Sequence, residues 1–138
     1  MRKRTLAREF ALQVLYQLDI TSDTPENALD NFWSNHSDEE IDATLKEFSA
    51  QLVIGVAGNR EEIDKKIVQF ATNWQLKRMA VVDRNIMRLG CFELLYREDI
   101  PPKVSINEAV ELAKKFSGLE SGKFVNAILD KVKLEKKK

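Results

Sequence analysis

The stretch "SINEAVELAKKFSGLESGKFVNAILDKV", residues 105–132, decides the fold class because it contains two amphipathic helices and the stop between them. Ser105 and Glu108 have the spacing of a capping box, which predicts that a helix opens there. Gly118 is typical of a helix C-terminal cap, and Ser121 predicts the start of a final helix. Apolar residues recur every three or four positions in both segments, so we expect two consecutive helices.

Residues 118–126, "GLESGKFVN", also look like a phosphate-binding loop, with two glycines and a lysine before an apolar run. A nucleotide-binding P-loop needs four residues between its glycines and a Ser or Thr after its lysine. Here three residues separate Gly118 from Gly122, and Phe124 follows Lys123. Because no hydroxyl is available for magnesium at that position, the sequence argues against a nucleotide site.

Helical signals continue through the rest of the chain, and the short alternating runs that predict strands are absent. We therefore expect an all-α fold of about seven helices. Gly55 and Gly58 weaken the helical pattern near Asn59, which predicts two packed helical subdomains, about 1–58 and 59–138, within a single domain, 1–138. Apolar residues recur every four positions over 6–18, which predicts an amphipathic helix whose Arg8 and Glu9 face water. The other signals are a Thr24-Pro25 start, a capping box at Ser37 and Glu40, a cap at Asn59, and a long helix over 81–96 that Pro101 and Pro102 cannot continue.

Composition argues against several classes of function. The chain has one cysteine, Cys91, which its apolar neighbours predict to be buried, and one histidine, His36, which we expect in a solvated loop. Neither a zinc-like set nor a catalytic Cys-His or Ser-His pair can be assembled, so we expect no catalytic residue, no metal and no cofactor. No apolar run approaches the roughly 18 residues of a membrane span, and the N-terminus lacks the apolar region of a signal peptide. The sequence predicts a soluble, cytoplasmic protein.

The charges are unevenly distributed although the chain as a whole is neutral. Residues 19–48 contain nine acidic residues and one base, Lys46, a net charge of −8, so the remainder carries +8. Positive residues gather at the two ends of the sequence. Such a separation suits a polyanionic partner, and the alternative is that the basic ends only keep the chain solvated.

Residues 81–132, "VVDRNIMRLGCFELLYREDIPPKVSINEAVELAKKFSGLESGKFVNAILDKV", closely resemble the NusB family of bacterial transcription antitermination factors. The front of the chain, "RKRTLAREFALQVLYQLDI" at residues 2–20, is similar to the arginine-rich first helix of that family. The resemblance spans nearly the whole chain, and the acidic stretch over 22–47 is its least distinctive part. In combination, the Asp-Arg-Asn segment at 83–85, "IPPKVSINEAVELAKKF" and "SGKFVN" are specific.

The resemblance implies an all-helical fold of two subdomains and no catalysis. It implies binding to the boxA element of nascent ribosomal RNA together with NusE, a protein that also belongs to the small ribosomal subunit. It further implies assembly with other Nus factors on RNA polymerase, which promotes processive ribosomal RNA synthesis. The same fold occurs as the front domain of a family of ribosomal RNA cytosine methyltransferases, and we expect no such catalytic domain after Lys138.

Four cations, Arg2, Lys3, Arg4 and Arg8, lie at the start of the first expected helix. A helix dipole favours anions there, so cations at this position suggest a receiver for phosphate to which backbone N–H groups contribute. Together with the resemblance, this pattern predicts RNA contact. The alternative is that these residues only keep a terminus soluble.

Lys123 and Phe124 fall in the first turn of the last expected helix, after the small Gly122. A lysine beside an aromatic ring combines phosphate attraction with a stacking surface for an unpaired base, so both residues are candidates for RNA contact. Phe124 is equally compatible with the core, because it begins the apolar stripe of that helix.

Tyr16 and Asp83 are the candidates for contact with the protein partner. Tyr16 lies two turns beyond Arg8 on nearly the same face of the first helix, where it either meets a partner or packs in the core. Asp83 begins the long helix, where the dipole favours an acid with or without a partner, and the resemblance makes it a candidate for contacting NusE.

Three classes of function follow from these observations. The leading hypothesis is a non-enzymatic RNA- and protein-binding adaptor. The second is a helical protein-interaction module without direct RNA contact, whose lysines serve solvation. The third is an enzyme such as a detached methyltransferase domain, against which the missing nucleotide loop, metal set and catalytic pair all argue.

Overall fold

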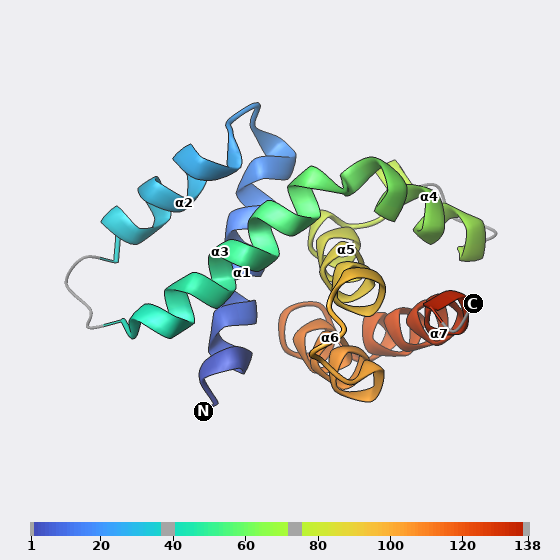
Figure 1. Cartoon of the computed structure of the whole chain (residues 1–138). Coiled ribbons are helices and arrows are strands. Elements are labelled where there is room, and N and C mark those ends of the chain that lie inside the picture. The colour runs from blue at the N-terminus through green and yellow to red at the C-terminus, as the bar shows by residue number, and fades with distance from the viewer. Residues whose placement is uncertain (1, 37–40, 72–75, 137–138) are drawn as a thin grey trace. The chain divides into compact units, whose positions relative to one another are not determined.

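The protein is all-helical, as the sequence predicts. The computed structural model describes residues 2–36, 41–71 and 76–136, which form seven α-helices, one short 3-10 helix and no strand. Contacts between backbone segments divide the chain into two compact units, Met1–Gly58 and Asn59–Lys138 (Figure 1).

The first unit contains three helices: α1 (Lys3–Ile20), α2 (Pro25–Ser34) and α3 (Ala43–Gly58). α1 packs against both α2 and α3, and α2 also contacts α3. The buried apolar side chains include Ala11, Leu12, Val14 and Leu15 of α1, Leu29 of α2, and Phe48, Leu52 and Val53 of α3. Thr24 caps α2 as predicted, because its hydroxyl accepts a hydrogen bond of 3.1 Å from the N–H of Asn27.

α3 begins later than its predicted capping box. Ser37 and Glu40 lie outside the described residues, and the helix starts only at Ala43, after Asp42. The carboxylate of Asp42 accepts hydrogen bonds from the N–H of Thr44 at 2.8 Å and from the Thr44 hydroxyl. An aspartate caps a helix start as well as a serine does, so Asp42 supplies the N-terminal cap that we expected further upstream.

The single histidine lies in the turn after α2, as predicted, but it is half-buried against aromatic rings, so the prediction that it is solvated is wrong. The ring of His36 stacks on that of Phe32 with centroids 4.2 Å apart, and Phe10 lies 5.7 Å away. Its Nδ1 also lies 2.8 Å from the carbonyl oxygen of Phe32. Aromatic contacts of this kind and one backbone hydrogen bond fix the end of α2.

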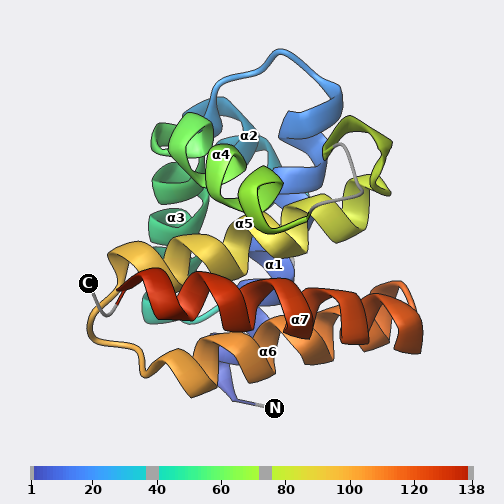
Figure 2. The same ribbon diagram turned by 90° about the vertical axis from the view of Figure 1, so that its right-hand side faces the viewer.

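The second unit contains the remaining elements: α4 (Arg60–Phe70), the 3-10 helix η1 (Leu76–Arg78), α5 (Val81–Tyr96), α6 (Pro102–Phe116) and α7 (Leu119–Lys136). Figure 2 shows α5, α6 and α7 side by side, and α4 contacts both α5 and α7. The bounds of α5 are those that the sequence predicts. Asn59 is the N-cap residue of α4, as predicted, although its side chain makes no capping hydrogen bond.

α6 begins three residues before its predicted start. Pro102 takes the first helical position, where its missing N–H costs nothing and its fixed φ suits a helix. Ser105 is therefore inside the helix and buried, and its hydroxyl donates a 2.9 Å hydrogen bond to the buried carboxylate of Glu93. The predicted capping box of Ser105 and Glu108 is wrong because the pair lies a full turn into the helix.

Gly118 ends α6 as predicted. Its φ of +146° lies in the region that favours glycine, and its N–H donates to the carbonyl of Ala113 at 2.8 Å. The last helix then begins at Leu119 and not at Ser121. Consequently Lys123 lies in the second turn of α7, and the prediction that it occupies the first turn is wrong.

Candidate nucleic-acid and partner interface

The start of α1 brings three exposed cations together, as the sequence predicts. Arg2 is the N-cap residue, Lys3 and Arg4 follow it, and all three are exposed. The side chain of Arg2 makes no capping hydrogen bond, and the first turn of α1 contains no acidic residue. Positive side chains and the N-terminal N–H groups therefore act in the same direction and attract an anion.

Lys3 has a partner in the first unit. Its Nζ lies 2.9 Å from Oδ2 of Asp42, the residue that caps α3. Hydrogen bonds from Thr44 and then from Lys3 hold the pKa of Asp42 well below its usual range. Both side chains are exposed to water, where an ion pair contributes little, so a phosphate group can replace Asp42 as the partner of Lys3.

Arg4 and Arg8 both lie over one aromatic ring, but only Arg4 is exposed. The guanidinium carbon of Arg4 is 4.3 Å from the centroid of Phe48, and that of Arg8 is 5.4 Å away. The side chain of Arg8 is only 3% exposed, and Glu9 beside it is buried too. The prediction that Arg8 and Glu9 face water is therefore wrong, because α1 buries more of its circumference than an amphipathic stripe requires.

The second cationic position is on α7. Lys123 is highly exposed, and its Nζ lies 3.5 Å from Oε1 of Glu120, one turn earlier in the same helix. Because Lys123 lies in the second turn, the helix dipole adds less to its attraction for phosphate than we expected.

Phe124 lines a pocket instead of lying wholly in the core. The pocket has a volume of about 360 Å³, within the range of small-ligand sites. It is formed by the residues before α5, the first turn of α5 and the first turns of α7, namely Arg78, Met79, Ala80, Asp83, Glu120, Ser121 and Phe124. Phe124 itself is half-buried, so its ring contacts both the protein and the pocket.

Asp83 lies in the first turn of α5, as predicted, and its carboxylate faces the start of α7. Oδ2 accepts a hydrogen bond of 3.1 Å from the hydroxyl of Ser121, which in turn lies 2.8 Å from the hydroxyl of Ser117. The other oxygen, Oδ1, is buried and has no hydrogen-bond partner in the described residues. An unpaired buried carboxylate oxygen is costly, so the environment of Asp83 is not fully satisfied by the described residues.

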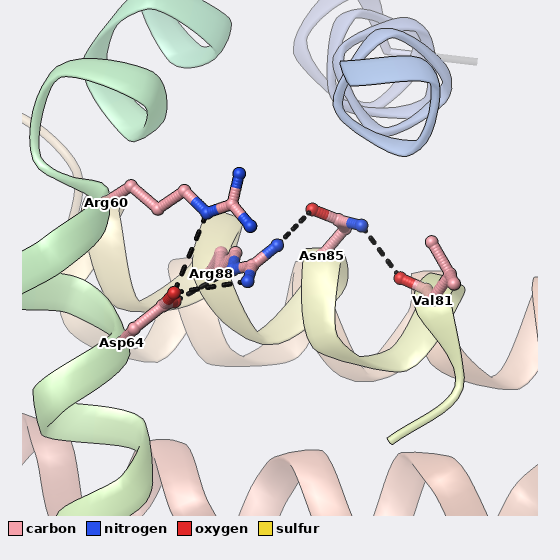
Figure 3. A network of polar contacts seen from close by, with 5 residues as sticks. All are labelled: Arg60, Asp64, Val81, Asn85 and Arg88. Carbon is pink, nitrogen blue, oxygen red and sulfur yellow. Dashed lines mark hydrogen bonds and ion pairs between the residues drawn. The ribbon is translucent and has the colours of Figure 1, made fainter. Parts of the chain in front are cut away.

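A buried polar network holds the first turns of α5 in place (Figure 3). Arg88 donates to both carboxylate oxygens of Asp64 on α4, with Nε 2.8 Å from Oδ1 and Nη2 3.1 Å from Oδ2. Nη1 of Arg88 also donates to Asn85, whose amide donates to the carbonyl of Val81 at 2.8 Å. The network thus links α4 to the turn of α5 that carries Asp83.

Tyr16 lies in the later part of α1 and is 39% exposed, so it is not the core tyrosine of the alternative interpretation. Sequence reasoning did not find Arg78 and Ser121 as neighbours of Asp83. Ser121 was interpreted as a helix start, and its hydrogen bond joins residues 38 positions apart, which no local pattern reveals.

The described residues lack the requirements of a metal site, a reactive thiol and a membrane span. No group of three or more histidine, cysteine, aspartate or glutamate side chains is placed there to hold a metal ion. Cys91 is buried, and this burial raises the pKa of its thiol to about 12. Among the described helices, none has both the length and the apolar character needed to cross a membrane.

The fold and the candidate interface define a small all-helical protein with exposed cations at the start of α1 and in the second turn of α7. The profile of the NusB family matches residues 5–133, and the chain belongs to that family. The transcription antitermination protein NusB of Myxococcus xanthus is 50% identical over 133 residues, which cover 96% of this chain and 95% of that protein.

Solved structures agree with this assignment. A structure of T. maritima NusB superimposes with a TM-score of 0.85 at 35% identity and covers 96% of this chain and 91% of its own. A crystal structure of the antitermination factors NusB and NusE in complex with double-stranded RNA contains a chain with a TM-score of 0.86 and 29% identity, covering 98% of both chains.

Proposed function

We propose that this protein is a transcription antitermination factor that binds boxA of nascent ribosomal RNA together with NusE. The observation that carries the proposal is the start of α1, where three exposed cations lie together and the first turn contains no acid. It occurs in a member of a family whose relatives are named for antitermination, and a NusB of similar fold was crystallised with NusE and RNA.

In this proposal the complex joins other Nus factors on RNA polymerase in the cytoplasm and promotes processive ribosomal RNA transcription. The two helical units work as one NusB-like domain over residues 1–138. The task is to bring an RNA and a protein together, which needs no catalytic residue, cofactor or metal. We therefore propose an adaptor and not an enzyme.

The RNA side of the interface consists of Arg2, Lys3, Arg4, Lys123 and Phe124. The exposed cations contact phosphates, and the ring of Phe124 stacks on an unpaired base at the edge of its pocket. Arg8 acts indirectly, because its buried guanidinium packs on the same ring of Phe48 as that of Arg4 and so fixes the surface on which Arg4 lies.

The protein side consists of Asp83 and Tyr16. Asp83 is half-buried and acidic, so its accessible side can pair with an arginine or lysine of a basic ribosomal protein. Tyr16 offers an exposed ring with a polar hydroxyl, a side chain that is common at protein interfaces.

The proposal is tested by RNA binding in solution. Fluorescence anisotropy with labelled boxA RNA and with a scrambled RNA is measured with and without NusE, over a series of salt concentrations. We expect tighter binding to boxA when NusE is present and a steep loss of affinity with salt, because counterion release drives such binding. Equal affinity for boxA and the scrambled RNA in the presence of NusE would exclude the specific part of the proposal.

Matched variants separate site lysines from ordinary surface lysines. Lys123→Gln should weaken boxA binding. Lys65→Gln on α4 should not, although Lys65 forms a similar exposed ion pair with Glu62 at 3.4 Å. A protein that binds NusE but whose α1 gives no crosslink to RNA would instead support the interaction module without direct RNA contact.

A further inference from the structure

We infer that the RNA path of the second unit continues from Lys123 onto the end of α6, where Lys114, Lys115 and Phe116 form a second site for single-stranded RNA. The inference rests on the proposed function and adds residues beyond Lys123 and Phe124, which together we call the α7 site. We call this surface the α6 corner.

The first observation is that Lys114 lies directly over α7. A Cβ atom placed on Gly122 would meet Cγ of Lys114 at 3.1 Å and its Cε at 3.7 Å. The stem of Lys114 therefore crosses the backbone of the residue that precedes Lys123. The absence of a side chain at Gly122 leaves the space that Lys114 occupies, and this places its ammonium group beside the α7 site.

The second observation is an exposed aromatic ring next to the neighbouring lysine, Lys115. Phe116, the last residue of α6, is 43% exposed, and Nζ of Lys115 lies 5.3 Å from the centroid of its ring. Leu119 at the start of α7 is 69% exposed. Large apolar side chains that remain in water at one corner mark a binding surface more often than isolated exposed residues do.

Charge selects the partner of the α6 corner. Lysines in the last turn of a helix also stabilise its negative end, so the two lysines alone would need no partner. The helix dipole does not explain why a phenylalanine stays exposed beside them. Lysines with an exposed ring are the combination that binds phosphates and stacks bases of a single strand.

The local acids do not prevent this binding. Nζ of Lys114 lies 3.6 Å from Oε1 of Glu111 in an exposed pair. Exposed pairs of this type are weak, so a phosphate can compete for the lysine. Residues 114–124 contain three lysines and one acid, Glu120, which leaves the α6 corner and the start of α7 positive.

The test compares three variants of the full-length protein in complex with NusE, using labelled boxA RNA. Phe116→Ala should weaken RNA binding by between about 5-fold and 100-fold, the usual effect of losing one base-stacking ring. Lys114→Gln with Lys115→Gln should reduce the slope of log K against log salt by about 1.4, or about 0.7 for each lost phosphate contact. Leu134→Ala, an exposed apolar residue near the end of α7, serves as the control and should leave both quantities unchanged.

Crosslinking of the unmodified complex provides a second readout that does not depend on how well the variants fold. Ultraviolet crosslinks between boxA RNA and the peptide containing Phe116 are expected.

If Phe116→Ala and the double lysine variant bind RNA within twofold of the unmodified protein while Lys123→Gln binds more weakly, the α6 corner is not on the RNA path, although the proposed function stands. Loss of NusE binding in Phe116→Ala with unchanged RNA affinity would assign the corner to protein and also overturn the inference. If the unmodified complex does not prefer boxA to scrambled RNA, the proposed function itself fails.

Discussion

At the scale of single residues, two arginines one helical turn apart on α1 have different environments. Both pack on the ring of Phe48, but Arg8 is buried and Arg4 is exposed. A buried guanidinium is held by its packing and its polar partners, whereas an exposed guanidinium remains available to a ligand. We therefore expect Arg8 to contribute mainly to stability and Arg4 mainly to RNA binding.

Arg8→Gln should lower the free energy of unfolding by about 2 kcal/mol, because it removes a desolvated cation–π contact and buried packing. Arg4→Gln should cost less than about 1 kcal/mol but should weaken boxA binding. Urea denaturation followed by circular dichroism gives the first quantity and anisotropy the second. A destabilised Arg4→Gln and an unaffected Arg8→Gln would contradict this division.

The sequence predicts the position of Arg8 on the helix but not its burial. Its neighbours Leu6 and Phe10 belong to the expected apolar stripe, which leaves position 8 on the polar side. Arg8 is buried because α1 packs against two helices, α2 and α3. Its contact with Phe48 joins residues that are 40 positions apart in the sequence. Local periodicity contains no information about such a contact.

The buried thiol of Cys91 should make the stability of the protein depend on pH. Burial raises the pKa of its thiol from 9.0 to about 12, so the folded protein keeps the proton to a higher pH than the unfolded chain does. The contribution of the protonated Cys91 thiol to stability is complete below pH 9 and is lost as the pH rises towards 12. The free energy of unfolding falls over this range by up to about 1.4 kcal/mol per pH unit.

The comparison of the unmodified protein with Cys91→Ala isolates this effect from lysine and tyrosine titration. Urea denaturation at pH 8, 9.5 and 10.5 should show that the stability difference between the two proteins shrinks as pH rises. A thiol reagent at pH 8 should label Cys91 only in urea. Fast labelling of the native protein would show that the thiol is not held in the core.

At the scale of helices, the elements with strong apolar periodicity are the most predictable. α5 has its predicted bounds because an apolar face and the later prolines define it on both sides. The starts of α6 and α7 are earlier than predicted, since Pro102 and Leu119 begin helices without a hydroxyl cap. Capping signals compete with one another along a chain, and the sequence alone does not show which one the packing selects.

The ion pair between α4 and α5 should be essential for the stability of the second unit. Arg88 is 3% exposed and contacts Asp64 with two nitrogens, so Arg88→Met leaves a carboxylate and an amide without this donor. We expect a loss of about 3 kcal/mol in the free energy of unfolding. Arg60→Gln is the matched control, because Arg60 lies 3.7 Å from the same carboxylate but is exposed, and it should cost less than about 1 kcal/mol.

A separate variant tests whether the network positions Asp83 for its partner. A milder change, Asn85→Asp, removes the amide donor to the carbonyl of Val81 while it keeps the size of the side chain. If the network orients the first turn of α5, NusE affinity should fall in this variant while RNA affinity without NusE should not. Equal NusE affinity in a folded Asn85→Asp protein would show that the network serves stability alone.

At the scale of the whole molecule, charge is separated along a chain whose net charge is zero. The acids concentrate in residues 19–48, and the candidate RNA-binding cations are in the first turn of α1 and at the start of α7. The sequence alone predicts this separation and the polyanionic partner. It does not predict that Lys3 pairs with Asp42, 39 residues away, so the free cations are fewer than a count of bases indicates.

The salt dependence of RNA binding tests whether both units contact one RNA. Lys3→Gln with Arg4→Gln removes two cations from the first unit, and Lys123→Gln removes one from the second. If all three contact phosphates of a single strand, the slope of log K against log salt should fall by about 1.4, by about 0.7 and, in the triple variant, by about 2.1. Such additivity is expected because Lys3 and Lys123 pair with different carboxylates, those of Asp42 and Glu120. Lys65→Gln should leave the slope unchanged. A triple variant with the slope of the first-unit variant would mean that the RNA contacts the first unit only, and the α7 site and the α6 corner would then lie off the RNA path.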